Sequence, residues 1–177
     1  VRVCDAQQFI LGPQVEQLES TLAQRIGVRH AIGVSSGTDA LLVSLMALDI
    51  GPGDEVITPT FSFVATAGSV ARLGATPVFV DVDPMTMMID ADHVGRAITP
   101  RTKAIVPVHL FGLCADMEPL IELARSRDIA IVEDAAQALG ATVHGRGCVA
   151  SSRAAVSPAK PAPTTTTSYS SSSIAVP

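Results

Sequence analysis

One carboxylate, Asp134, lies where an apolar segment gives way to small residues. The sequence IAIVEDAAQALG, at residues 129–140, predicts a buried strand that runs directly into this aspartate. In an open α/β sheet, ligands bind in the crevice just outside the carboxyl ends of the strands. We therefore expect Asp134 to bind a ligand rather than to be a solvated charge.

The sequence SSGTD, at residues 35–39, separates a short apolar run from a segment rich in Ala and Leu. Backbone N–H groups and the positive end of the dipole at a helix start favour a bound phosphate. Gly37 would let the backbone approach the phosphate, and Ser36 and Thr38 would supply hydroxyl groups. The alternative is that this segment only caps the helix. Neither the G-x-G-x-x-G fingerprint nor the P-loop sequence is present, so a smaller phosphorylated cofactor is favoured over a dinucleotide or ATP.

Aromatic side chains are rare in this chain, which has five Phe and one Tyr, yet two of them lie in the sequence TFSFVAT at residues 60–66. This segment follows an apolar strand, so a flat ring there could stack on a heteroaromatic ligand. Core packing is the alternative for both rings, and more so for Phe61 than for Phe63.

A phosphate cradle, a stacking ring and a buried carboxylate together indicate pyridoxal 5'-phosphate as the cofactor. Asp134 would keep the pyridine nitrogen of this cofactor protonated, and a protonated ring stabilises carbanions by withdrawing their electrons. The cationic nitrogen would in turn keep Asp134 ionised.

The elements that must position these groups alternate along the chain. Apolar positions three and four residues apart predict an amphipathic helix at 13–26, with Pro13 in its first turn. After it, short apolar strands alternate with helices, which is typical of right-handed βαβ crossovers. We expect strands at 31–34, 55–58, 77–82, 103–109 and 129–133, and helices at 40–48, 64–73, 91–98 and 117–127. The sequence thus predicts an α/β fold with a mostly parallel sheet sandwiched by helices.

The 177-residue chain has a formal net charge of -5 at pH 7, and no run of Lys or Arg forms a basic stripe. Nucleic acid is therefore not an expected partner. The apolar segment 40–50 is far shorter than the roughly 20 residues that a membrane helix needs. We expect no membrane span and no signal peptide. Asp81 and Asp83 are expected to be solvated turn residues at the end of a strand.

The three cysteines, Cys4, Cys114 and Cys148, are widely spaced and show no C-x-x-C pattern. We expect them to be reduced thiols of a cytoplasmic protein. The four histidines are equally scattered, so no metal site is predicted. His109, which follows an apolar strand, could enter the ligand site, or it could be a hydrogen-bonded structural residue.

Composition divides the chain near residue 150. Residues 1–150 have the composition of a globular protein, whereas residues 151–177 are rich in Ser, Thr and Pro and include the sequence TTTTSYSSSS. Such a segment cannot bury enough apolar surface to offset the entropy lost on ordering it. We therefore expect a partial cofactor-binding domain at 1–150 and a disordered or non-native tail at 151–177.

Six stretches follow one another in a specific order: SGTDAL (36–41), GPGDEVI (51–57), PVFVD (77–81), ITPRTKAI (98–105), PVHLFG (107–112) and VEDAAQA (132–138). Together they closely resemble the DegT/DnrJ/StrS family of sugar aminotransferases, which are fold-type I enzymes that use pyridoxal phosphate. The resemblance runs from residue 9 to residue 147. It implies the large domain of a fold-type I enzyme, which is incomplete in this chain.

By position, the resemblance implies that Gly37 and Thr38 hold the phosphate and that Phe63 lies over the cofactor ring. Asp134 would pair with the ring nitrogen, and Gln137 would lie near the ring's phenolic oxygen. The family's typical reaction moves an amino group from glutamate or glutamine to a keto group of a nucleotide-linked sugar or a cyclitol. Its members are homodimers with active sites at the interface.

The resemblance ends after Gly147. Family members continue to an S-F-x-P-x-K-N motif, whose lysine forms a Schiff base with the cofactor and moves a proton. This chain has the sequence SPAKP at 157–161. Lys160 is therefore the candidate catalytic lysine, and an exposed lysine in an unstructured tail is the alternative.

Two other functions stay open. A sugar dehydratase of the same fold has a histidine in place of the lysine, and it eliminates a group from the sugar instead of transferring an amino group. The segment that distinguishes the two is missing from this chain. The second alternative is a truncated, catalytically inactive product, which the change of composition at Ser151 would explain.

Overall fold

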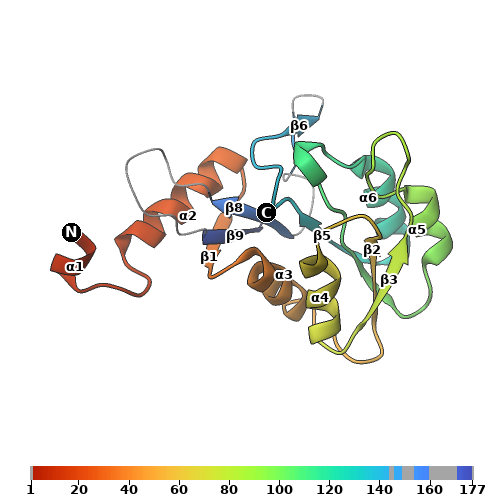
Figure 1. Ribbon diagram of the computed structural model, residues 1–177, viewed down its shortest axis with the longest axis horizontal. Coiled ribbons are helices and arrows are strands. Elements are labelled where there is room, and N and C mark those ends of the chain that lie inside the picture. The colour runs from red at the N-terminus through yellow and green to blue at the C-terminus, as the bar shows by residue number, and fades with distance from the viewer. Residues whose placement is uncertain (1, 144–145, 149–153, 160–170, 177) are drawn as a thin grey trace.

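A seven-stranded sheet forms the centre of the protein (Figure 1). The computed structural model describes residues 2–143, 146–148, 154–159 and 171–176. The strands follow one another across the sheet in the order β1-β9-β8-β5-β4-β2-β3. Their bounds are β1 His30–Val34, β2 Glu55–Pro59, β3 Thr76–Val80, β4 Thr102–Ile105, β5 Ala130–Asp134, β8 Ala154–Ala159 and β9 Ser171–Val176. A separate antiparallel pair is formed by β6 Thr142–Val143 and β7 Arg146–Gly147.

The strands of the large sheet run in the same direction, except for β9. β2 pairs in parallel with β3 and β4, β4 pairs in parallel with β5, and β5 pairs in parallel with β8. β9 is antiparallel to both of its neighbours, β8 and β1, so β1 points the same way as β5. The predicted α/β fold with a mostly parallel sheet is confirmed.

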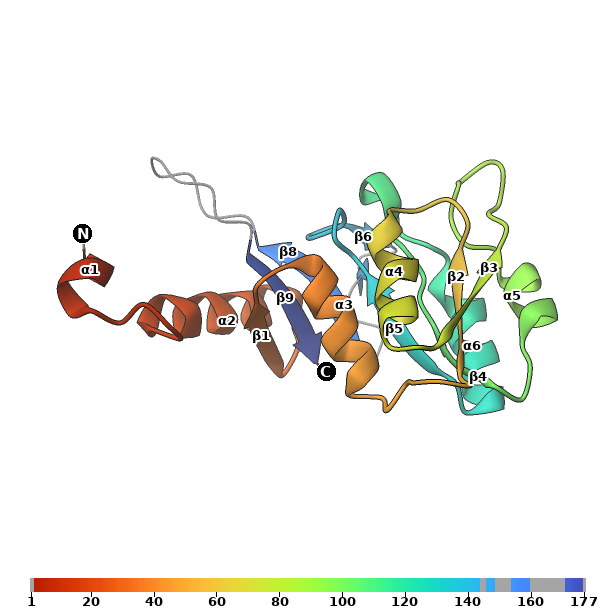
Figure 2. The same ribbon diagram turned by 60° about the horizontal axis from the view of Figure 1, so that its bottom comes forward.

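Helices cover both faces of this sheet (Figures 1 and 2). The helices are α1 Arg2–Ala6, α2 Pro13–Ile26, α3 Gly37–Met46, α4 Val64–Arg72, α5 Ala91–Ala97 and α6 Met117–Arg127, and a short 3-10 turn, η1, spans Leu110–Gly112. α3 and α4 pack together over one face, and α5 and α6 pack together over the other. α1 and the segment before α2 project away from the sheet (Figure 2).

Alternate residues of the central strands face the two helix layers. The cluster toward α5 and α6 includes Ile57, Ile105, Ile131, Val94 and Leu120. The cluster toward α3 and α4 includes Val56, Ala104, Val132, Leu41 and Val70. Burial on both faces explains why these strands are apolar throughout. Each fully buried Val, Leu or Ile contributes about 1.5–3 kcal/mol through removal of its apolar surface from water.

Most predicted elements have the predicted bounds to within a few residues. The helix at 13–26 matches α2, which ends at Gly27 in the left-handed conformation, with φ 79°. α3 begins at Gly37, before the predicted start, because Ser36 caps it. The strand predicted at 103–109 is regular only to Ile105, although Val106 still donates a hydrogen bond to the carbonyl of Ile57.

Two strands come from the Ser-, Thr- and Pro-rich segment, an arrangement that composition did not predict. β8 lies beside β5 and places residues 154–156 opposite residues 132–134. β9 lies between β8 and β1, and it is the strand that connects β1 to the rest of the sheet. The division into a domain at 1–150 and a tail at 151–177 remains a prediction.

Cys114 and Cys148 form a disulfide, with their Cα atoms 5.8 Å apart, while Cys4 is free and exposed. The prediction of three reduced thiols is therefore wrong for this pair. The two residues are 34 positions apart in the sequence, so only the packing of the segment after η1 against the segment after β7 brings them together. No helix in the described part of the chain is long and apolar enough to cross a membrane.

Candidate functional site

A cavity of about 250 Å³ lies at the carboxyl ends of the parallel strands. Its lining residues come from the segments that follow β1, β2, β4 and β5. They are Gly37, Thr38, Leu41, Ser62, Phe63, Ala65, Val108, His109, Leu110, Asp134, Ala136 and Gln137. This cavity therefore brings together five of the six residues predicted for the site. The sixth, Lys160, lies outside the described residues.

Asp134 is buried at this cavity, with 5% of its surface exposed. Its backbone is held by two hydrogen bonds of 2.9 Å, one donated to the carbonyl of Pro107 and one accepted from the N–H of His109. Its carboxylate oxygen Oδ2 accepts a 2.8 Å hydrogen bond from the hydroxyl of Thr66. Oδ1 accepts a longer bond, of 3.3 Å, from the N–H of Ala136. The carboxylate is thus restrained, and it keeps lone pairs for a ligand.

Burial raises the pKa of Asp134 above its ordinary value of 3.8, and the hydrogen bonds from Thr66 and Ala136 offset this only in part. The native protein therefore binds a proton at this carboxyl more tightly than the unfolded chain does. A cation placed against the carboxylate would oppose the shift, because an opposite charge favours the ionised form.

The Asp134→Asn variant is expected to gain stability relative to the wild-type protein as the pH rises. Below about pH 4 the carboxyl is protonated in both the native and unfolded states. At higher pH the unfolded chain loses this proton first, so the wild-type protein loses stability until the pH has passed the raised native pKa. Asparagine does not titrate and keeps its stability.

Urea unfolding of both proteins, without added cofactor, measures this difference in the free energy of unfolding from about pH 4 to about pH 8. A difference that stays constant over this range would contradict a raised pKa at Asp134.

The start of α3 also lies at the cavity. The hydroxyl of Ser36 accepts a 3.1 Å hydrogen bond from the N–H of Asp39 and donates one of 2.8 Å to its carboxylate. Ser35 donates a further bond to that carboxylate, and the two serine hydroxyls lower the pKa of Asp39. Within the described chain, the N–H groups of Gly37 and Thr38 make no hydrogen bond, as expected for the first turn of a helix. Capping therefore engages the Ser36 hydroxyl and leaves these N–H groups available to an anion.

Phe63 directly precedes α4, and 69% of its surface is exposed. A ring this exposed is not part of the core, and it is available to stack on a planar ligand. Phe61 instead meets the ring of Phe111 edge-on, with the ring centroids 6.4 Å apart and an interplanar angle of 64°. Of the two rings considered from the sequence, Phe63 is the one that lines the cavity.

Gln137 holds the turn that follows β4. Its Oε1 accepts a 2.7 Å hydrogen bond from the backbone N–H of Phe111. Phe111 has a φ of 56°, a left-handed conformation that is uncommon for residues other than glycine. The side-chain carbonyl of Gln137 thus fixes a strained turn, and its amide nitrogen remains able to donate to a ligand.

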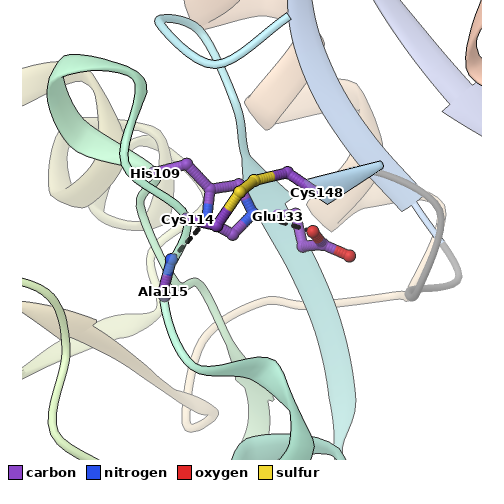
Figure 3. Close-up of a disulfide and its surroundings, with 5 residues drawn as sticks. All are labelled: His109, Cys114, Ala115, Glu133 and Cys148. Atoms are coloured by element: carbon purple, nitrogen blue, oxygen red, sulfur yellow. Dashed lines mark hydrogen bonds and ion pairs between the residues drawn. A yellow bond between two sulfur atoms is a disulfide. The ribbon is translucent and has the colours of Figure 1, made fainter. Parts of the chain in front are cut away.

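His109 is fully buried, and both of its ring nitrogens have partners (Figure 3). The backbone N–H of Ala115 donates to Nδ1 at 3.1 Å, so Nδ1 carries no proton. Nε2 must therefore carry the proton, and it donates to Glu133 Oε2 at 2.8 Å. His109 is therefore a neutral, hydrogen-bonded histidine, the structural role considered for it from the sequence, and it also lines the cavity.

Two buried polar residues near the site were missed by sequence reasoning. Thr66, with 1% of its surface exposed, donates to Asp134, and Glu133 holds His109 on the opposite face of β5. The sequence carries a weak signal for each: Thr66 ends the TFSFVAT segment, and Glu133 is a carboxylate within an apolar strand. Neither signal predicts which residue is the hydrogen-bond partner, because both contacts join segments that are distant in the sequence.

The residues at the cavity fit pyridoxal phosphate. The free N–H groups at the start of α3 suit its phosphate, and the exposed ring of Phe63 suits its heteroaromatic ring. Asp134 is a buried carboxylate that, among the described residues, has no Lys or Arg partner. Such a group is costly unless a cation compensates it, and a protonated ring nitrogen supplies one. Over the same residues, no three His, Cys, Asp or Glu side chains gather to hold a metal ion.

Known proteins resemble this chain closely. The UDP-N-acetyl-3-dehydro-alpha-D-glucosamine 3-aminotransferase of Acidithiobacillus ferrooxidans is 53% identical over 146 residues, which are 82% of this chain and 40% of that protein. The crystal structure of S. venezuelae DesV in complex with a ketimine intermediate matches with a TM-score of 0.92 and 42% identity, over 99% of this chain and 47% of that one. NtdA from Bacillus subtilis, with bound cofactor PMP, matches with a TM-score of 0.88 and 37% identity, over 99% of this chain and 39% of that one.

The chain thus spans less than half the length of each of these relatives. The sequence model of one family matches residues 1–161, which include the start of α3, the Phe63 loop and the end of β5. The family's description is DegT/DnrJ/EryC1/StrS aminotransferase. This chain belongs to the DegT/DnrJ/EryC1/StrS aminotransferase family.

Proposed function

We propose that this chain is the cofactor-binding part of a pyridoxal-phosphate-dependent sugar aminotransferase. One observation carries the proposal: a single cavity brings together a helix start, an exposed aromatic ring and a buried carboxylate. Within the described part of the chain, the first N–H groups of that helix make no hydrogen bond and the carboxylate has no Lys or Arg partner. The bound PMP in the NtdA structure supports the same cofactor.

Each residue at the cavity has a distinct task in this proposal. The N–H groups of Gly37 and Thr38 bind the phosphate, assisted by the dipole of α3. Phe63 covers one face of the ring and excludes water from it. Asp134 accepts a hydrogen bond from the ring nitrogen and keeps the proton there. Gln137 donates its amide N–H to the ring's phenolic oxygen.

When bound, the cofactor supplies an electron-withdrawing ring and carries an amino group between two substrates. A base that moves protons at the substrate carbon is also needed, and we propose Lys160 for this role. Lys160 directly follows β8 in the sequence, and β8 is the parallel neighbour of β5, which ends at Asp134. Parallel strands have their carboxyl ends at one edge of the sheet, where ligands bind.

As the amino acceptor we propose the keto group of a nucleotide-linked sugar or a cyclitol, and as the donor glutamate or glutamine. The Acidithiobacillus relative supports the acceptor class, since its name specifies a UDP-linked 3-dehydro sugar. That relative is more than twice as long as the matched segment, so the activity is proposed for a whole protein of which this chain forms one part.

We also propose a homodimer. Large apolar side chains are exposed on the segment between α1 and α2: Phe9, Ile10 and Leu11 have 68%, 85% and 73% of their surfaces exposed. This segment projects from the sheet (Figure 2), and contiguous exposed apolar residues of this kind mark interaction sites. A second copy of the chain is the partner that we propose for it.

The proposed location is the cytoplasm. The Cys114–Cys148 disulfide is an observation against this location, because thiols in the cytosol are kept reduced.

Borohydride trapping tests the proposed cofactor and lysine together. Purified protein is mixed with pyridoxal phosphate, its absorbance spectrum is recorded before and after borohydride, and any pyridoxyl-lysine is mapped by mass spectrometry. We expect labelling at Lys160. The chain has one other lysine, Lys103, which is exposed on β4 and serves as an internal control for non-specific reaction.

Each outcome has a distinct meaning. Labelling of Lys160 alone supports the proposed role of this lysine. Equal labelling of Lys103 and Lys160 contradicts it, because an unpositioned lysine reacts in the same way. Specific binding of the cofactor without labelling would mean that the chain keeps the cradle and lacks the catalytic lysine. Absence of binding would contradict the proposed function.

A further inference from the structure

The hydroxyl of Thr66 donates the shorter of the two hydrogen bonds that the carboxylate of Asp134 accepts. It donates to Oδ2 at 2.8 Å, and both residues are buried. The bond to Oδ1, from the N–H of Ala136, is 3.3 Å long. Thr66 lies in the first turn of α4, and 68 positions separate it from Asp134 in the sequence. This contact is therefore the main side-chain restraint on the orientation of the carboxylate.

The hydroxyl of Thr66 has a second neighbour, the hydroxyl of Ser62, at 3.3 Å. An ionised carboxylate can only accept, so the single proton of the Thr66 hydroxyl is committed to Asp134. Ser62 must then donate to Thr66. The hydrogen bonds run in one direction, from Ser62 through Thr66 to Asp134, and bonds in such a chain polarise one another.

We infer that Thr66 is a positioning residue for the cofactor's ring nitrogen, because it holds the Asp134 carboxylate in one orientation and stabilises its charged form. The inference rests on the proposed function, since it assigns Asp134 to that nitrogen. Thr66 itself touches neither the cofactor nor the substrate in this assignment. It acts through the carboxylate, just as residues that hydrogen-bond to a metal ligand orient that ligand.

Thr58 provides an internal comparison. It is also a fully buried threonine, on β2, the strand that precedes α4. Its hydroxyl has no hydrogen-bond partner among the described residues. Replacement of either threonine by valine removes one hydroxyl and keeps the shape, but only at Thr66 does the change remove a bond to Asp134.

The first test uses the protein without cofactor. The carboxyl carbon of Asp134 is titrated by NMR in the wild-type protein and in the variants Thr66→Val, Thr66→Ser and Thr58→Val. We expect Thr66→Val to raise the pKa of Asp134, because the hydrogen bond favours the charged form. Thr66→Ser should restore the wild-type value, and Thr58→Val should leave it unchanged. An unchanged titration in Thr66→Val overturns the inference.

The second test compares two ligands: pyridoxal phosphate and its 1-deaza analogue, in which a carbon atom replaces the ring nitrogen. We expect Thr66→Val to bind pyridoxal phosphate at least tenfold more weakly than the wild-type protein, as for a lost hydrogen bond to a charged group. Its affinity for the analogue should match that of the wild-type protein. Equal weakening toward both ligands would assign Thr66 a general structural role and overturn the inference.

Failure of the proposed function gives a different result. A wild-type protein that binds neither ligand contradicts the cofactor, while the NMR titration still reports whether Thr66 controls Asp134. Thermal unfolding of each variant identifies any that does not fold. Thr66→Ser, which keeps the hydroxyl, then provides the comparison at the same position.

Discussion

The Asp134→Asn variant is expected to bind pyridoxal phosphate on the order of 10²-fold more weakly than the wild-type protein. Removal of one member of a buried, hydrogen-bonded charge pair costs about 2–5 kcal/mol, and about 1.4 kcal/mol is a tenfold change in Kd. Asparagine keeps the size of the side chain, and its amide oxygen can still accept the hydrogen bond from Thr66. The loss of affinity would therefore report the loss of the charge.

Absorbance titration with pyridoxal phosphate gives the Kd of each protein. Asp81→Asn is the matched control, because Asp81 is an exposed carboxylate that follows β3 and lies outside the cavity. Its Kd should equal that of the wild-type protein. If Asp134→Asn bound the cofactor as tightly as the wild-type protein does, Asp134 would not pair with the ring nitrogen, and the proposed arrangement of the cofactor would be wrong.

The alternation of strands and helices could be predicted from the sequence because the central strands are buried on both faces. Such strands are continuous apolar runs, and helical segments follow β2 and β4 in the chain. The helices at 13–26 and 117–127 have the predicted bounds. The position of Asp134 followed from the same pattern, since a carboxylate after an apolar run must lie at a strand end. The topology of parallel sheets then places it at the ligand-binding edge.

The hydrogen-bond partners of this carboxylate could not be predicted in the same way. Thr66 reaches Asp134 only because α4 packs against the sheet with its first turn at the cavity. The pairing of His109 with Glu133 depends on the local path of the chain after β4, where the N–H of Ala115 turns back to the imidazole. Sequence spacing does not predict these contacts, because each joins residues from different elements.

The start of α3 had two interpretations, of which the structure shows one, the helix cap. The sequence SSGTD was considered as a phosphate cradle or as a helix cap. In the structure the cap uses the Ser36 hydroxyl and the carboxylate of Asp39. The free N–H groups belong to Gly37 and Thr38, the residues that line the cavity. Capping satisfies only part of the unpaired donors of a first turn, so the observed cap is compatible with the phosphate site, which stays a prediction.

The chain shortened to residues 1–150 is expected to lose its cooperative thermal unfolding transition. The shortened chain lacks β8 and β9, so β5 becomes an edge strand and β1 loses the strand that pairs with it. α3, which contacts β8 and β9, loses part of the surface that it covers. Exposed strand edges also favour association between chains. The free energy of unfolding of a domain is only about 5–15 kcal/mol. The stabilisation lost with two central strands is therefore comparable to this total.

Differential scanning calorimetry of the full chain and of residues 1–150 measures this effect. The matched control removes residues 1–6 instead, because residues 4–6 are exposed and the proposed dimer segment at residues 9–11 stays in place, and its melting temperature should stay close to that of the full chain. The full-length variant Ser173→Pro isolates the contribution of β9, since proline cannot donate a hydrogen bond within a central strand. It should shift the transition in the same direction. If residues 1–150 melted as the full chain does, the composition of residues 151–177 would have described them correctly as a tail, and the sheet that binds the cofactor would end at β5.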